Sequence, residues 1–204
     1  MNAHSREVSY GQRGLTIIDR FGVALSRHAV LKHWPSKRVS DLIDIGCGFH
    51  ATLLRSLIKP AGHGVAVDWE LSDDLRAIKG LESFEGDLMA TLPKFTDSRF
   101  DVALLLSVLE HVPRPVELLQ ECHRILRPDG RLLVNVPTWR GKSFLEFSAF
   151  RLGASPACEM DDHKMYYDKR DLWPRLVEAG FRPSRIKMHY HKWGLNLFAC
   201  ADKG

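Results

Sequence analysis

The sequence has few cysteines, and they are not grouped. Its four cysteines, Cys47, Cys122, Cys158 and Cys200, are far apart, and no two of them form a C-x-x-C pair. A zinc knot or a disulfide framework is therefore not expected, and this cysteine usage is typical of a protein in the reducing cytoplasm.

Long apolar runs are also missing. The longest largely apolar stretch, residues 102–109, is far shorter than the ~20 residues that a membrane-spanning helix needs. The first seven residues, MNAHSRE, lack the apolar core of a secretory signal. We therefore expect no membrane span and a cytoplasmic location.

Charge of one sign is not in large excess. Lys and Arg number 29 against 25 Asp and Glu, which gives a formal net charge of +4. Basic residues gather mildly over residues 164–192, but acidic residues interrupt them, so the pattern predicts a solvated face and no nucleic-acid partner. Hydrophobic residues at 45% and charged residues at 26% are typical of one globular domain.

Strand-like and helix-like segments alternate along the chain, which predicts an α/β fold with a doubly wound sheet and an antiparallel edge. The predicted strands cover residues 42–45, 64–68, 83–85, 100–106, 131–136, 186–190 and 195–201. The predicted helices cover residues 15–34, 51–58, 71–78, 113–126, 144–152 and 168–179, and a long loop is expected between the third strand and Ser98.

The first predicted strand leads into a glycine-containing turn, Asp44-Ile45-Gly46-Cys47-Gly48. Gly46 and Gly48 permit the turn and let a ligand approach the backbone, whose N–H groups are expected to point into a crevice at the strand's carboxyl end. Cys47 is interpreted as a small residue that fills the turn. Because Ala51 follows at the spacing of a dinucleotide fingerprint, a nicotinamide cofactor is one reading of this turn.

Acidic residues favour a different cofactor. Asp44 would face a pyrophosphate with like charge, whereas the ammonium and sulfonium groups of S-adenosylmethionine would be attracted to it. Asp68, about 20 residues further on, can accept hydrogen bonds from two ribose hydroxyls, and Asp87 is placed to meet an adenine amino group beside the apolar Leu88. The alternatives are that Asp44 is a satisfied strand-end acid and that Asp68 and Asp87 are helix caps or turn residues.

These motifs occur in an order that resembles the class I S-adenosylmethionine-dependent methyltransferases, in their small-molecule branch. The resemblance covers residues 40–137 well and continues loosely to the last two strands. The matching segments are 42–48 (LIDIGCG), 64–68 (GVAVD), 86–88 (GDL), 100–112 (FDVALLLSVLEHV) and 125–136 (ILRPDGRLLVNV). One departure is His50, which stands where many relatives have a third glycine.

The resemblance implies a seven-stranded, Rossmann-like sheet whose last strand is reversed, S-adenosylmethionine as cofactor and a small-molecule acceptor. The expected oligomeric state is a monomer or a homodimer. The resemblance divides the domain into an N-terminal helical extension (1–36), a cofactor-binding core (40–137), a substrate-pocket segment (138–168) and a terminal helix with a hairpin (169–204). The residues expected to hold the cofactor are Asp44, Gly46, Cys47, Gly48, Asp68, Trp69, Asp87, Leu88 and Leu106. Trp69 is either a lid on the adenine or a packing residue.

Two histidines are candidates for a general base that deprotonates the acceptor. His111 follows the central strand, and His163 lies in a segment that resembles the one before the family's penultimate helix. A histidine titrates near neutral pH, which suits this role, although His111 could instead cap or pack.

Three further functions compete with a small-molecule methyltransferase. Glu110-His111 with His189 and His191 resembles the ligand set of metal-assisted RNA 2′-O-methyltransferases, but Ser107 stands where that family has a further glutamate, so no metal site is predicted. The second is a nicotinamide oxidoreductase. The third is a non-catalytic module that binds a partner through its N-terminal helix.

Overall fold

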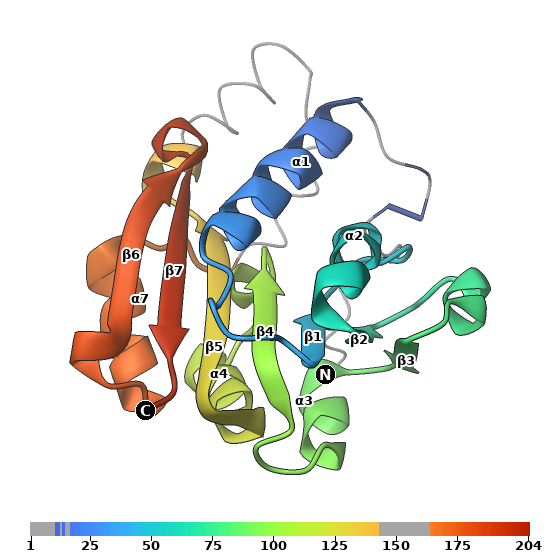
Figure 1. The fold of residues 1–204 in the computed structure, drawn as a ribbon. Coiled ribbons are helices and arrows are strands. Elements are labelled where there is room, and N and C mark those ends of the chain that lie inside the picture. The colour runs from blue at the N-terminus through green and yellow to red at the C-terminus, as the bar shows by residue number, and fades with distance from the viewer. Residues whose placement is uncertain (1–10, 13, 15–16, 143–163) are drawn as a thin grey trace.

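The computed structural model describes residues 11, 12, 14, 17–142 and 164–204, and it is built around one seven-stranded sheet (Figure 1). The strand order is β3-β2-β1-β4-β5-β7-β6. The first five strands in this order, β3, β2, β1, β4 and β5, are parallel, and β7 is antiparallel to its neighbours β5 and β6. The predicted doubly wound sheet with a reversed last strand is therefore confirmed. The strands are β1 (Asp41–Ile45), β2 (His63–Asp68), β3 (Leu81–Glu85), β4 (Phe100–Leu106), β5 (Leu126–Pro137), β6 (Ile186–His191) and β7 (Asn196–Asp202).

Helices cover both faces of the sheet. They are α1 (Ile17–Lys32), α2 (Thr52–Ala61), α3 (Leu88–Thr91), α4 (Pro115–Ile125) and α7 (Lys169–Glu178), with short 3₁₀ turns at η1 (Asp73–Ala77), η2 (Leu92–Lys94), η3 (Leu109–His111), η4 (Pro183–Arg185) and η5 (Lys192–Gly194). In β1, Ile43 and Ile45 face the core shared with α4 and α7, whereas Leu42 faces the core shared with α1 and α2. This period of two places successive strand residues in different cores.

Asp44 follows from the same alternation. It lies on the face of Leu42, in a strand whose other inward positions are apolar, and it is buried. The central strands β1 and β4 are almost wholly buried because helices lie on both of their sides. A carboxylate at this position is therefore withdrawn from water by the architecture of the sheet.

Several predicted boundaries are wrong in detail. The long loop expected before Ser98 contains α3, which begins because the Asp87 carboxylate accepts a hydrogen bond from the Ala90 amide at 3.0 Å, and η2. The helix expected over 71–78 is only a 3₁₀ turn. Strand β5 begins at Leu126, because the Pro128-Asp129-Gly130 turn is a register shift within the strand.

The terminal elements agree with the sequence. Asp168 caps α7 in a reciprocal arrangement with Asp171, and Gly180 follows the helix with φ +107°. The turn between β6 and β7 falls on Lys192-Trp193-Gly194 as expected. The helix expected over 144–152 lies outside the described residues. Over the described ranges, no helix is long and apolar enough to cross a membrane.

Candidate functional site

Three acidic residues lie at the carboxyl ends of three neighbouring strands. Asp44 is in β1, Asp68 ends β2, and Asp87 follows β3. Because β1, β2 and β3 are adjacent and parallel, these ends meet at one edge of the sheet, next to the end of β4. The crossing from β1 to β4 is the point where the chain reverses direction across the sheet, which is where open α/β sheets bind ligands.

Asp44 lies in an unusual electrostatic environment. Its residue is 3% exposed, and within the described part of the chain no lysine or arginine pairs with it. Burial, with a smaller contribution from the Asp68 carboxylate, raises the pKa of Asp44 to about 7. A carboxylate held in this way attracts a cationic group, because a cation compensates the charge that burial makes costly.

The glycine turn is tightly built. Gly46 and Gly48 have φ of +73° and +76°, which a residue with a side chain adopts only with strain. A Cβ at Gly46 would also overlap the Cγ2 atom of Val108. The turn therefore needs glycine at position 46 for two independent reasons.

The amides of this turn are used inside the protein. Those of Gly46 and Cys47 donate to the Val67 carbonyl at 2.7 and 3.3 Å, and that of Gly48 donates to Asp68 Oδ2 at 2.7 Å. The expectation that the turn's N–H groups point into the crevice is thus wrong for these three, because the β1–β2 contact and Asp68 take them. A pyrophosphate would not find these donors, which weakens the nicotinamide alternative.

Asp68 is held by two backbone amides. Its Oδ2 accepts from Gly48 and its Oδ1 accepts from Trp69, each at 2.7 Å. These two hydrogen bonds fix the orientation of the carboxylate at the end of β2. The Trp69 side chain is half exposed, which places an aromatic surface directly after the β2 end.

The remaining predicted cofactor residues lie around the same edge. Asp87 is exposed, and its Oδ1 atom caps α3, which agrees with the alternative that this residue is a helix cap. Leu88 is partly buried and packs against the core. Leu106 is partly buried at the end of β4. Burial, and after it the negative charges of Asp44 and Asp68, raises the pKa of the Cys47 thiol well above its ordinary value, so this cysteine stays protonated. The His50 ring lies nearly perpendicular to the Phe49 ring, with their centroids 4.9 Å apart.

The acceptor side of the site lies beyond β4 and β5. His111 is in η3, directly after β4, and is partly buried. His163 lies outside the described residues. Asn135 was not predicted from the sequence. It is buried near the end of β5 with its Nδ2 3.4 Å from Ser107 Oγ, whereas its Oδ1 has no hydrogen-bond partner in the described structure. The available signal was a single polar residue inside the apolar run of β5.

The two histidines of β6 do not join Glu110 and His111. Strands β5 and β7 separate β6 from β4. His189 instead lies 4.7 Å from the His33 ring, and both His189 and His191 contact Phe198. Over the described ranges, no group of three or more His, Cys, Asp or Glu residues is arranged to hold a metal ion.

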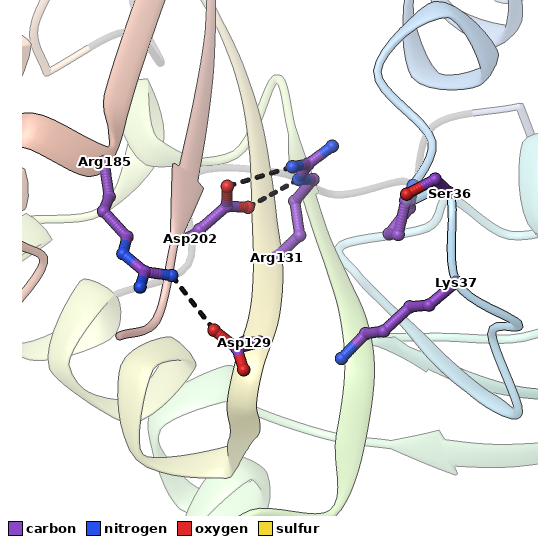
Figure 2. A pocket seen from close by; sticks show the side chains of 7 residues that line it. Ser36, Lys37, Asp129, Arg131, Arg185 and Asp202 are labelled. Atoms are coloured by element: carbon purple, nitrogen blue, oxygen red, sulfur yellow. Dashed lines mark hydrogen bonds and ion pairs between the residues drawn. The ribbon is translucent and has the colours of Figure 1, made fainter.

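A separate cavity of about 200 Å³ lies at the opposite, amino-terminal edge (Figure 2). Asp202 accepts from Arg131 at 2.5 and 2.9 Å, and Asp129 accepts from Arg185 at 3.0 Å. Because each acid in its wall is paired with an arginine, this cavity does not offer the unbalanced charge found around Asp44. Its walls are Pro35, Ser36, Lys37, Asp129, Arg131, Arg185 and Asp202.

Several known proteins with similar sequences are methyltransferases. A family model described as a methyltransferase domain matches residues 43–134. The ubiquinone biosynthesis O-methyltransferase of Xylella fastidiosa is 32% identical over 198 residues, which cover 81% of this chain and 76% of the relative. The ubiquinone/menaquinone biosynthesis C-methyltransferase UbiE of Roseobacter denitrificans is 35% identical over 182 residues, with 76% and 71% covered. This chain spans only 30% and 64% of the length of two other matched relatives.

The fold comparison agrees. The crystal structure of an S-adenosylmethionine-dependent methyltransferase from Archaeoglobus fulgidus has a TM-score of 0.66 at 16% identity, with 94% of this chain and 96% of that chain covered. At this identity the likeness concerns the fold, and the Xylella and Roseobacter relatives establish the family. This chain belongs to the class I S-adenosylmethionine-dependent methyltransferases, enzymes whose cofactor is S-adenosylmethionine.

Proposed function

We propose that this protein transfers the methyl group of S-adenosylmethionine to a small-molecule acceptor. The observation that supports this most is the buried Asp44 carboxylate, whose raised pKa and lack of a cationic partner among the described residues fit a positively charged ligand. When bound, the cofactor supplies a methyl group on a sulfonium sulfur, which is already activated for transfer.

Each predicted cofactor residue has a chemical role in this proposal. Asp44 provides the negative charge for the ammonium and sulfonium groups, and Asp68 accepts hydrogen bonds from the ribose hydroxyls. Asp87 accepts from the adenine amino group with the oxygen that does not cap α3, and Leu88 contacts the ring. Gly46, Cys47 and Gly48 form the wall of the site, and Trp69 and Leu106 add apolar contact.

The acceptor would lie beyond the ends of β4 and β5. His111 is our candidate for the group that removes a proton from an acceptor hydroxyl, because it lies in η3, shortly after the end of β4, and histidine is the most common general base in enzymes. Asn135 Oδ1 and Ser107 add polar atoms at the same edge. These side chains would align the acceptor, since methyl transfer depends chiefly on position and exclusion of water.

The acceptor class is a sugar, a lipid-linked intermediate or a secondary metabolite. The names of the Xylella and Roseobacter relatives, both of ubiquinone biosynthesis, favour the lipid-linked class among these three. One of them is an O-methyltransferase and the other a C-methyltransferase, so the names leave the methylated atom open.

Calorimetry with S-adenosylhomocysteine and with NAD tests the cofactor. We expect the first to bind and NAD to bind far more weakly, because the amides of the glycine turn are already used. Tighter binding of NAD would refute the proposal. Formation of S-adenosylhomocysteine with a panel of acceptors then separates an enzyme from a non-catalytic module.

His111→Ala tests the proposed base. Once an acceptor is found, we expect this variant to lower kcat by about 100-fold while cofactor affinity changes little. His63→Ala is the matched control, because His63 lies at the start of β2, near Asp41 and Glu82. Equal losses of kcat and of cofactor affinity in His111→Ala would make His111 a structural residue instead.

A further inference from the structure

The turn between β6 and β7 presents its tryptophan to solvent at the cost of an unfavourable backbone. Lys192 and Trp193 have φ of +49° and +58°, in the left-handed region that residues other than glycine and asparagine rarely adopt. Trp193 is 75% exposed, the highest value among the exposed large hydrophobic residues in the described part of the chain. Strain that persists in this way is a reason to look for a function, because tertiary contacts must hold it in place.

Those contacts come from the segment that follows β5. The Thr138 hydroxyl donates to the Gly194 carbonyl at 2.8 Å, and the Thr138 amide donates to the Leu195 carbonyl at 3.0 Å. The Arg140 guanidinium lies beside Gly194. The turn and the residues after β5 therefore form one surface, at the end of the molecule where the parallel strands finish (Figure 1).

Two more exposed rings and three cations belong to this surface, which we call the aromatic tip. It consists of Trp139, Tyr190 and Trp193 with Arg140, Lys142 and Lys169. The ammonium group of Lys142 lies 5.8 Å from the Trp139 ring, and that of Lys169 lies 5.3 Å from the Tyr190 ring. Asp171, which contacts Trp139, already accepts from the Trp139 indole and from the Asp168 amide.

We propose that the aromatic tip docks on the surface of an anionic lipid bilayer. Trp and Tyr combine an apolar ring with a polar atom, which suits the boundary between lipid headgroups and acyl chains. Lysine and arginine beside such rings are attracted to anionic headgroups. A protein partner fits less well, because lysine is depleted from the centres of protein interfaces.

Docking at this place has a consequence for the proposed function. Only this consequence, and not the docking itself, depends on the proposed function. The aromatic tip and the carboxyl ends of β1 and β4 lie at the same end of the molecule (Figure 1). A bilayer bound there would be close to the acceptor side of the site. An acceptor with a lipid tail could then be methylated while its tail remains in the bilayer.

Flotation of the whole protein with vesicles tests the docking without any cofactor. We expect binding to phosphatidylcholine vesicles that contain phosphatidylglycerol, little binding to phosphatidylcholine alone, and loss of binding as salt is added. Equal binding to both compositions, or none to either, would overturn the proposal. Since no acceptor or cofactor is present, this result is independent of the methyltransferase proposal.

Trp193→Gly is the most informative variant, because it removes the ring and relieves the left-handed strain at once. We expect vesicle binding to fall about tenfold while the thermal stability is kept or raised and binding of S-adenosylhomocysteine is unchanged. Unchanged vesicle binding would exclude the aromatic tip. If the wild type forms dimers that this variant dissolves and no vesicle binding is seen, the surface is a contact between two copies.

The charge component has a matched control. Arg140→Gln with Lys142→Gln should abolish the preference for anionic vesicles, whereas Lys37→Gln with Lys94→Gln removes the same charge from exposed residues elsewhere and should preserve it. Equal losses in the two double variants would show that net charge alone draws the protein to the vesicles, and would overturn the assignment to this surface.

Discussion

Buried aspartates have opposite surroundings at the two ends of the parallel strands, which we call the amino-terminal and carboxyl-terminal edges of the sheet. At the amino-terminal edge, Arg127 donates to Asp41 and to Asp101, each at 2.8 Å, and the Ser40 and Asp41 amides also donate to Asp101. At the carboxyl-terminal edge, Asp44 is buried, as Asp101 is, but no arginine among the described residues pairs with it.

The pKa directions follow from this difference. Burial alone would raise the pKa of Asp101, but the two amides and the Arg127 guanidinium outweigh it, so the pKa lies below its ordinary value. At Asp44 burial is reinforced by the Asp68 charge, and the pKa rises to about 7. An aspartate therefore has a structural role at Asp101, where an arginine of the chain pairs with it. At Asp44, where no such arginine is found among the described residues, the carboxylate is available for a cationic ligand.

Asp44→Asn should give the largest effect, with opposite signs for stability and binding. Above pH 7 it removes a buried charge, so the free energy of unfolding of the ligand-free protein should rise, by up to about 4 kcal/mol. Affinity for S-adenosylhomocysteine should fall roughly tenfold to a hundredfold. Urea unfolding and calorimetry measure the two effects, and a variant that is less stable at this pH would show that Asp44 is already compensated.

Arg127→Ala should act only on stability. It leaves Asp101 buried without its cation, which should lower the free energy of unfolding by about 2–3 kcal/mol, less than for a fully buried pair because Arg127 is partly exposed. Urea unfolding measures this loss. If cofactor affinity falls in the folded variant as well, the two edges are coupled and the contrast between them is weaker than we infer.

Asp68→Ala should weaken cofactor binding by ~1–3 kcal/mol, because ribose hydroxyls would lose their acceptor. Asp68→Asn is the control that keeps one acceptor oxygen and should lose less. Calorimetry with S-adenosylhomocysteine measures both, and an unchanged dissociation constant in Asp68→Ala contradicts the ribose role. Some loss of stability is also expected, since Asp68 accepts the Gly48 and Trp69 amides.

The smallest expected effect is the pH dependence of cofactor binding. The folded pKa of Asp44, about 7, lies above its ordinary value of 3.8. The free energy of unfolding of the ligand-free protein should therefore fall as pH rises from about 4 through 7, because the buried carboxylate ionises. A cationic ligand, in contrast, needs the ionised carboxylate. Affinity should therefore increase about tenfold between about pH 6 and about pH 8. Calorimetry in buffers of different ionisation enthalpy should detect the released proton, and Asp44→Asn should lose both signals.

Much of the fold could be predicted from local patterns. Strands such as β4 appear as apolar runs, and α4 and α7 appear as apolar positions at helical spacing, because both periodicities follow from backbone geometry. Helix α3 was missed because four residues are too short for a periodic signal. Its start depends on one capping carboxylate, Asp87, which was predicted from the sequence to bind the cofactor, with a helix cap as the alternative.

The candidate site was predicted less completely. The acids at the strand ends were found because the order of the strands can be inferred from their connections. The hydrogen bonds that the Gly46, Cys47 and Gly48 amides donate inside the protein were not predicted, because they depend on how β1 pairs with β2. Asn135 was missed for a similar reason, because its contact with Ser107 joins two strands.

The sequence by itself determined which residue types stand at the ends of the parallel strands, since hydrophobic period and glycine punctuation are local properties. Only the tertiary structure decided the charge state of these residues and which other residues lie next to them. Asp41 and Asp44 are three residues apart, yet among the described residues Asp41 pairs with Arg127, whereas the pKa of Asp44 is raised by burial and by the Asp68 carboxylate. The physical reason is that desolvation and pairing depend on neighbours brought together from distant parts of the chain, and the backbone strain at Trp193 depends on them in the same way.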